Sequence, residues 1–162
     1  MFRNPAFTSK QITQILRIHP QTLAGWLKKG ILWPRIYAAP GKGTAHLFDL
    51  ANVLEAAIIR ELSKDKYSLD FIGAVLGCLE EQQFINRFLG QVSSDLESDT
   101  QVYLLWRGDF VGQPSSMELI EVGKSKTELE LGCEEFERTL VINLGRLVNR
   151  ICVELEELGV RI

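Results

Sequence analysis

The stretch FTSKQITQILRIHPQTLAGWLKKGIL, residues 7–32, decides the fold of this 162-residue chain. Thr8 and Gln11 stand three residues apart, the spacing of the two members of a capping box at a helix N-terminus. His19 then occupies an N-cap position, and Pro20 follows at the first helical position, where the missing N–H costs nothing. The pattern predicts two short helices joined by a tight turn, which is a helix-turn-helix.

The second of these helices is expected to have one apolar face and one polar face. The apolar residues recur at helical spacing, at Leu23, Trp26 and Leu27. Gln21 and Thr22 lie near the exposed start, and both side chains can hydrogen-bond base edges. Gly25 weakens the helix by roughly 1 kcal/mol relative to Ala. Close approach to a sugar-phosphate backbone or a helix–helix contact would each explain it. Gly30 ends the helix.

The next residues predict a β-hairpin followed by two more helices. Residues 36–38 and 45–48 can form two short strands around a turn at residues 40–43. Asp49 is placed to cap a third helix, and Ser68 to start a fourth. Both helices carry apolar residues at helical spacing.

Residues 7–76 resemble the DNA-binding domain of MerR-family transcription regulators. The matching pieces are HPQTLAGWLKKGIL at residues 19–32, GKGTAHLFDLANVLEAAIIREL at residues 41–62 and YSLDFIGAVL at residues 67–76. The resemblance covers a little under half of the chain and depends on the order and spacing of these pieces. It implies a winged helix-turn-helix, a homodimer, and binding to a two-fold operator within a promoter.

The chain also departs from the family pattern. The family usually has an Arg after the Thr-Leu pair and then two aromatic residues, where this chain has Ala24, Gly25 and Trp26. The usual wing Arg, two residues before an aromatic, is His46 here, with Phe48 as the aromatic. Fewer cations on these surfaces predict fewer phosphate contacts and weaker binding.

The candidate DNA-binding residues follow from the helix pair and from this resemblance. Polar residues of the second helix are expected at base edges, and cations and hydroxyl groups at phosphates. The wing residues are expected to reach flanking phosphates or the minor groove. The full set is Thr8, Ser9, Gln21, Thr22, Gly25, Trp26, Lys28, Lys29, Arg35, Lys42 and His46.

The charge of the chain is divided unevenly along its length. Residues 1–76 contain 10 Lys and Arg against 5 Asp and Glu, whereas residues 77–162 contain 8 against 16. A basic front part attracts phosphate, and an acidic rear part argues against DNA that wraps around the whole molecule. The same difference could instead be ordinary variation of a solvated surface.

The second half is expected to contain a connecting helix, a small antiparallel sheet and a long C-terminal helix. The helix and a polar loop cover residues 79–92 and 93–100, and the strands cover 101–106, 117–122 and 127–131, with a turn at 107–109. The last helix, at residues 133–158, has a broad apolar stripe that could cover the sheet and meet a partner helix, or be wholly buried in a monomer. Its dimerisation candidates are Leu140, Leu144, Leu147, Ile151, Leu155 and Leu158.

The predicted fold class is therefore α+β and mainly helical: a winged helix-turn-helix domain at residues 1–76, then the sheet and the C-terminal helix at residues 77–162, for dimerisation or regulation. There is no phosphate loop, zinc-ligand spacing or nucleophile elbow, so we expect neither an enzyme nor a cofactor. The three cysteines lack C-x-x-C spacing, and we expect free thiols and no metal. No apolar run suits a membrane span or a signal peptide, which predicts a cytoplasmic protein.

Three functional hypotheses remain. The first is a homodimeric regulator of MerR-like type that binds double-stranded DNA at an operator and has no membrane contact, with a possible unknown effector. The second is a protein-interaction adaptor whose helix-turn-helix no longer binds DNA. The third is a phage- or recombination-associated factor that bends DNA with the same module.

Overall fold

The computed structural model describes residues 5–41, 44–81, 85, 101–108, 116–122 and 138–160. Within these ranges the chain is mainly helical, with two small antiparallel sheets. It divides into two compact units: unit 1 comprises residues 1–72 and 150–162, and unit 2 comprises residues 73–149. The division after residue 76 stays a prediction, and the last turns of the C-terminal helix belong to unit 1.

The two N-terminal helices begin at the residues that the sequence indicates. Helix α1 spans Ser9–Ile15 and helix α2 spans Pro20–Lys28. The capping box before α1 is complete, because the Gln11 amide donates to Thr8 Oγ1 at 3.4 Å and the Thr8 amide donates to Gln11 Oε1 at 2.9 Å. The Gln21 amide donates to His19 Nδ1 at 3.2 Å, so His19 caps α2. These cap predictions are confirmed.

Four helices in the described part of the chain end in the same way. After α1, α2, α3 (Leu50–Lys64) and α7 (Leu144–Glu157), one residue adopts a left-handed conformation, with φ of 49°, 67°, 63° and 70° at Arg17, Gly30, Lys66 and Gly159 respectively. The next amide then donates to a carbonyl five residues earlier, as Ile18 does to Thr13 at 3.0 Å. This closes the helix end. Arg17 and Lys66 accept a backbone strain that glycine avoids.

The paired segments of the expected hairpin are shorter than predicted. Strand β2 spans Leu47–Phe48 and pairs with β1, Phe7–Thr8, which the sequence had not indicated as a strand. The first limb of the hairpin contributes a single bridge between Tyr37 and Leu47, with backbone hydrogen bonds of 2.9 and 3.1 Å. The predicted strands at residues 36–38 and 45–48 are therefore longer than the paired segments in the structure.

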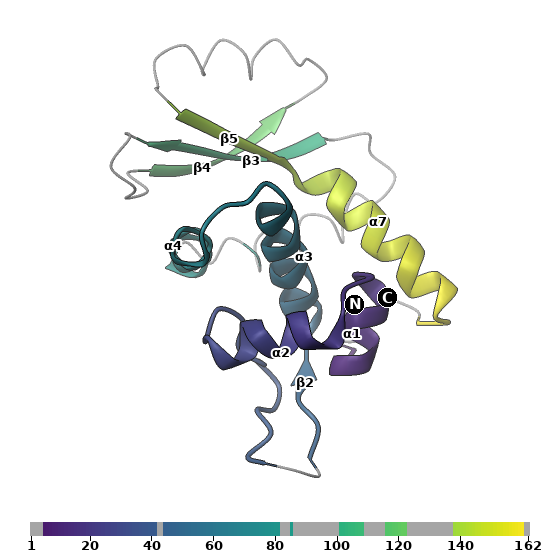
Figure 1. Cartoon of the computed structure of the whole chain (residues 1–162). Coiled ribbons are helices and arrows are strands. Elements are labelled where there is room, and N and C mark those ends of the chain that lie inside the picture. The colour runs from purple at the N-terminus through teal and green to yellow at the C-terminus, as the bar shows by residue number, and fades with distance from the viewer. Residues whose placement is uncertain are drawn as a thin grey trace. The chain divides into compact units, whose positions relative to one another are not determined.

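Helix α3 forms the centre of unit 1. Asp49 caps it through a 2.8 Å hydrogen bond from the Asn52 amide, as predicted. Residues 51–54, 56–59 and 62 are all buried. Helices α1 and α2 lie beside the end of α3 that follows β2, and the hairpin projects from that same end (Figure 1). Helix α4, Leu69–Glu81, then begins after Ser68, whose hydroxyl accepts from the Phe71 amide.

Unit 2 contains a three-stranded antiparallel sheet in the order β4-β3-β5. The strands are β3, Gln101–Gly108, β4, Ser116–Val122, and β5, Arg138–Asn143. The predictions of the first two strands are confirmed, but the predicted turn at 107 and 108 is wrong, because both residues pair within β3. The predicted strand at 127–131, the loop at 93–100 and most of the helix beyond Glu81 lie outside the described residues.

The prediction of one helix over residues 133–158 is wrong. Residues 138–143 form β5, and the helix, α7, begins at Leu144. The Asn143 side chain accepts from the Arg146 amide at 2.8 Å and so caps α7. Pairing of β5 with β3 overrides the helical spacing of its apolar residues.

The predicted dimerisation stripe is also wrong as a continuous helical surface. Leu140 lies in β5, and Leu144 is the first residue of α7. Leu147, Ile151 and Leu155 are only 4%, 4% and 0% exposed, so they pack within the chain itself. Among the four candidates whose exposure the structure describes, Leu158 is the one that keeps substantial exposure, at 40%. The homodimer stays a prediction.

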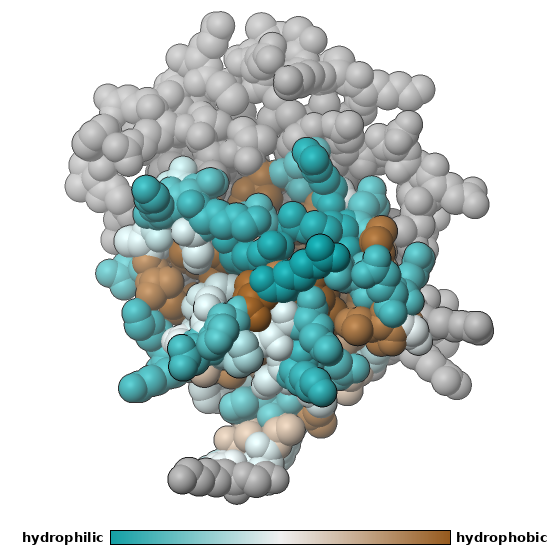
Figure 2. Space-filling view, turned by 45° about the vertical axis from the view of Figure 1, so that its right-hand side comes forward, coloured by the Kyte–Doolittle hydropathy of each residue, from teal (hydrophilic) through white to brown (hydrophobic). Residues whose placement is uncertain are grey.

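The surface of unit 1 is mixed in character. On the face drawn in Figure 2, hydrophilic residues cover much of the described surface and apolar areas are separated between them. Of the helices in the described ranges, none combines the length and the apolar character needed to cross a bilayer.

Candidate nucleic-acid interface

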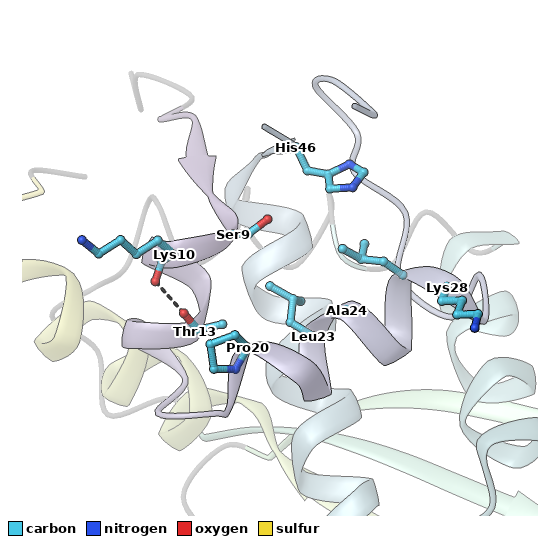
Figure 3. Close-up of a pocket in the computed structure, with 9 residues that line it drawn as sticks. Ser9, Lys10, Thr13, Pro20, Leu23, Ala24, Lys28 and His46 are labelled. Atoms are coloured by element: carbon cyan, nitrogen blue, oxygen red, sulfur yellow. Dashed lines mark hydrogen bonds between the residues drawn. The ribbon is translucent and has the colours of Figure 1, made fainter. Parts of the chain in front are cut away.

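A groove of about 590 Å³ opens between α1, α2 and the hairpin of unit 1 (Figure 3). Three successive parts of the chain line it. The lining residues are Ser9, Lys10 and Thr13 of α1, Pro20, Leu23, Ala24, Leu27 and Lys28 of α2, and His46 of the hairpin. The groove exists because the turn after α1 places the second helix across the first.

The groove has an apolar floor and cationic ends. Leu23 is buried at its base, and the exposed Ala24 lies between the two lysines in Figure 3. Lys10 and Lys28 are both exposed and lie at opposite ends of the lining. No acidic partner for either lysine occurs among the residues that the structure describes. Such a groove suits a ligand that is anionic along its edge and less polar in between.

The exposed face of α2 adjoins this groove. Gln21, Thr22, Lys28 and Lys29 are all exposed, as predicted for a face that meets a ligand. A Cβ atom built at Gly25 would meet nothing within 4 Å among the described neighbours. Within the described part of the chain, a tight helix–helix contact is therefore not the reason for a glycine at this position, and close approach of a ligand backbone stays a prediction.

Both histidines hold one ring nitrogen in a local hydrogen bond. His46 Nδ1 accepts from the Ala39 amide at 3.0 Å across the hairpin, and its ring lies 6.1 Å from that of Phe48. His19 Nδ1 likewise accepts from the Gln21 amide. Because an amide N–H donates to Nδ1, the uncharged ring must carry its own hydrogen on Nε2. The uncharged His46 side chain, which lines the groove, therefore has an N–H donor at Nε2.

Arg35 is engaged elsewhere, although it was predicted to hold a phosphate. Its guanidinium donates to Glu55 Oε1 and forms an ion pair with it. The Glu55 carboxylate is mostly buried, which raises its pKa, while the hydrogen bond and charge of Arg35 act in the opposite direction. Arg35 thus compensates a desolvated carboxylate of α3 and is removed from the candidate interface.

Asn52 is a structural residue that the sequence did not reveal. It is fully buried, and its amide Nδ2 donates to the Trp33 carbonyl and to Glu55 Oε2, both at 2.9 Å. Its Oδ1 accepts from the Arg35 amide at 2.9 Å. Asn52 therefore fixes to α3 the segment that leads from α2 into the hairpin. Two of these partners, Arg35 and Trp33, are 17 and 19 residues away in sequence, so no local pattern indicates them.

Two further predicted residues change their role. Trp26 is only 5% exposed, so it belongs to the core under α2 and not to the DNA-binding set. The Thr8 hydroxyl is occupied in the capping box, where it also donates to Gln11 Oε1 at 3.0 Å. Lys42 lies outside the described residues. The set that the structure brings together is therefore Ser9, Gln21, Thr22, Gly25, Lys28, Lys29 and His46.

The groove adds Lys10 and Thr13 to this set, which sequence reasoning missed. Ser9 and Thr13 stand four residues apart, which places them on one face of α1. That polar pair, with Lys10 beside it, was a signal available in the sequence. The Thr13 hydroxyl donates to the Lys10 carbonyl at 2.7 Å, a bond drawn in Figure 3.

The described ranges contain a free cysteine thiol but no candidate metal-ion site. No cluster of three His, Cys, Asp or Glu residues is placed there to hold a metal ion. Cys152 is a free, half-buried thiol of α7, and burial together with the nearby Glu156 carboxylate raises its pKa. A raised pKa makes a thiol less reactive at neutral pH.

No protein-family model matches the sequence, and no curated protein matches it. The functional inference therefore depends on the groove, the exposed face of α2 and the hairpin. These three features share one side-chain chemistry, which is cationic and hydrogen-bonding around a small apolar floor.

Proposed function

We propose that the chain binds double-stranded DNA as a winged helix-turn-helix of MerR-like type and regulates transcription as a homodimer at a promoter operator. In this proposal α2 enters the major groove and the hairpin is the wing. The groove between α1, α2 and the hairpin is the observation that carries it, because its lysines lie at opposite ends of an apolar floor. A sugar-phosphate strand has the matching chemistry, with anionic phosphates separated by less polar sugars.

The proposal gives each group a separate task. Gln21 and Thr22 reach base edges from the exposed start of α2, and Gly25 lets the helix backbone approach the duplex. Lys10, Lys28 and Lys29 neutralise phosphates. Base contacts then supply specificity, whereas the lysines supply most of the affinity.

The salt dependence of binding tests the assignment of the lysines. Each neutralised phosphate contributes about 0.9 to the slope of log affinity against log salt. Lys28→Gln combined with Lys29→Gln should therefore reduce that slope by about 1.8 per protomer and weaken binding to all sequences. A fluorescence anisotropy titration of a random-sequence duplex at several salt concentrations measures both quantities.

A matched control is available at the other end of α3. Lys64→Gln combined with Lys66→Gln removes the same charge, but α3 has 15 residues, so these lysines lie about 20 Å along its axis from the hairpin. The control should leave the slope nearly unchanged. Equal slopes for the two double variants would refute the placement of DNA along α2.

The adaptor hypothesis is favoured by one observation, which is that Arg35 is already occupied by Glu55. In this arrangement the Arg35 guanidinium neutralises a carboxylate of the chain itself instead of a phosphate of a duplex. Absence of binding at low salt, together with capture of a protein partner, would select the adaptor. A DNA-bending factor of phage or recombination type would instead shorten the distance between fluorophores at the two ends of a bound duplex.

The homodimer and the cytoplasmic location belong to the same proposal. Selection of duplexes by the purified protein, followed by sequencing, should return a two-fold symmetric site. A single half-site, together with a monomer in sedimentation, would contradict the dimeric regulator while leaving DNA binding intact.

A further inference from the structure

The end of α7 contacts the turn between α1 and α2. The Arg17 guanidinium lies 2.6 Å from Glu154 Oε1, and the side chains are 68% and 14% exposed respectively. Arg17 is also the residue of that turn whose φ is 49°. An exposed cation on a strained turn is thus held by a mostly buried carboxylate of a helix distant in sequence.

A second ion pair lies one turn earlier on the same helix. Arg150 donates to Glu61 of α3 at 2.8 Å. Ile151 follows Arg150, and Leu155 follows Glu154. These two apolar side chains are 4% and 0% exposed respectively. Charged and apolar residues at a spacing of four therefore make one face of α7, and this face is packed within unit 1.

The same helix belongs to both units. It starts at Leu144, directly after β5, and residues 150–157 fall in unit 1. Within unit 1, this part of α7 contacts the α1–α2 turn through Glu154. That turn joins the two helices that line the groove, which include Lys10 of α1 and Lys28 of α2.

We propose that Glu154 is a positioning residue for DNA binding: its ion pair with Arg17 holds the α1–α2 turn in the geometry that lets both helices contact one DNA strand. The inference rests on the proposed function. Because the Arg17 side chain is 68% exposed, the pair should contribute about 1 kcal/mol or less to folding and can break without unfolding the protein.

The test compares two variants with the same change in charge. Glu154→Gln removes the partner of Arg17, whereas Glu157→Gln removes an exposed carboxylate of the same helix. Loss of an anion alone should strengthen DNA binding slightly in both. We expect Glu154→Gln instead to lower affinity for a random-sequence duplex by about two- to fivefold, which is the range that one surface ion pair supplies.

A charge exchange separates positioning from general damage. Arg17→Glu combined with Glu154→Arg should bind DNA better than either single variant, because the pair is restored in reverse. Equal affinity of Glu154→Gln and Glu157→Gln, or no recovery in the exchanged protein, would overturn the inference.

Failure of the proposed function would be recognised separately. If the wild-type chain does not bind a duplex at low salt, hydrogen exchange of the Ile18 amide, which donates to Thr13, still reports on the turn. Glu154→Gln should accelerate that exchange and Glu157→Gln should not. Equal exchange in both variants would refute the role of Glu154 whatever the ligand is.

Discussion

Replacing Asn52 with alanine should destabilise unit 1 more than any surface substitution. The side chain makes three hydrogen bonds of 2.9 Å, to the Arg35 amide, the Trp33 carbonyl and Glu55 Oε2. A typical hydrogen bond contributes about 1 kcal/mol to stability, and a polar group left unpaired inside the protein costs about 1–3 kcal/mol. The three bonds together give an expected loss of about 3 kcal/mol in the free energy of unfolding.

The measurement is urea denaturation followed by tryptophan fluorescence and by circular dichroism. A loss of this size should also lower the midpoint of thermal unfolding by about 6–12 °C for a chain of this length. The control is Asn149→Ala, because Asn149 is exposed on α7 and should change stability by less than about 0.5 kcal/mol.

The outcome that refutes the reasoning is a loss below about 1 kcal/mol, the value of a single ordinary hydrogen bond. Such a result would mean that the segment from α2 into the hairpin is held by its other contacts. A loss of the expected size with unchanged DNA affinity would separate stability from the presentation of the hairpin.

Three further predictions follow from the described contacts. Lys66→Gly should stabilise the chain by roughly 0.5–1 kcal/mol in urea denaturation, because Lys66 has a φ of 63°; a loss of stability would contradict strain at that helix end. Burial raises the pKa of Glu61, but hydrogen bonds from Lys64 and Arg150 outweigh it and lower the pKa below 4.5. The ionised Glu61 therefore stabilises the folded chain fully above that pH, and this contribution is lost on acidification. In Glu61→Gln the free energy of unfolding should decrease less between neutral and acid pH than in the wild type, as measured by denaturation. An unchanged pH profile would contradict the role of Glu61. His46→Asn keeps an acceptor for the Ala39 amide, whereas His46→Gln keeps an outward donor. Only His46→Gln should therefore retain DNA affinity in anisotropy titrations. The reverse order would assign His46 to the hairpin alone.

The sequence was most informative where a structural decision is local. Two residue pairs specify the two helix starts: Thr8 with Gln11, and His19 with Pro20. The members of each pair are at most three residues apart, because capping hydrogen bonds close over that span. Gly30 was recognised as a helix end for the same reason. Arg17 and Lys66 adopt the same conformation without a glycine, so composition alone could not indicate it.

Distant contacts could not be predicted. Residues 138–143 have apolar spacing compatible with a helix, and only pairing with β3 makes them a strand. The stripe on α7 looked available for a partner because nothing in the sequence indicates that Ile151 and Leu155 pack inside unit 1. In the candidate site, the faces of α2 were predicted, whereas the engagement of Arg35 by Glu55 was not.

The use of residues 150–160 to complete the N-terminal unit has a consequence for biosynthesis. A nascent chain that has extended only to residue 76 lacks Ile151 and Leu155, which are buried in the finished unit. The segment that completes the unit is made at least 70 residues later. Stalled or prematurely ended translation products would therefore expose apolar surface beside the α1–α2 turn and be preferred substrates for chaperones and proteases.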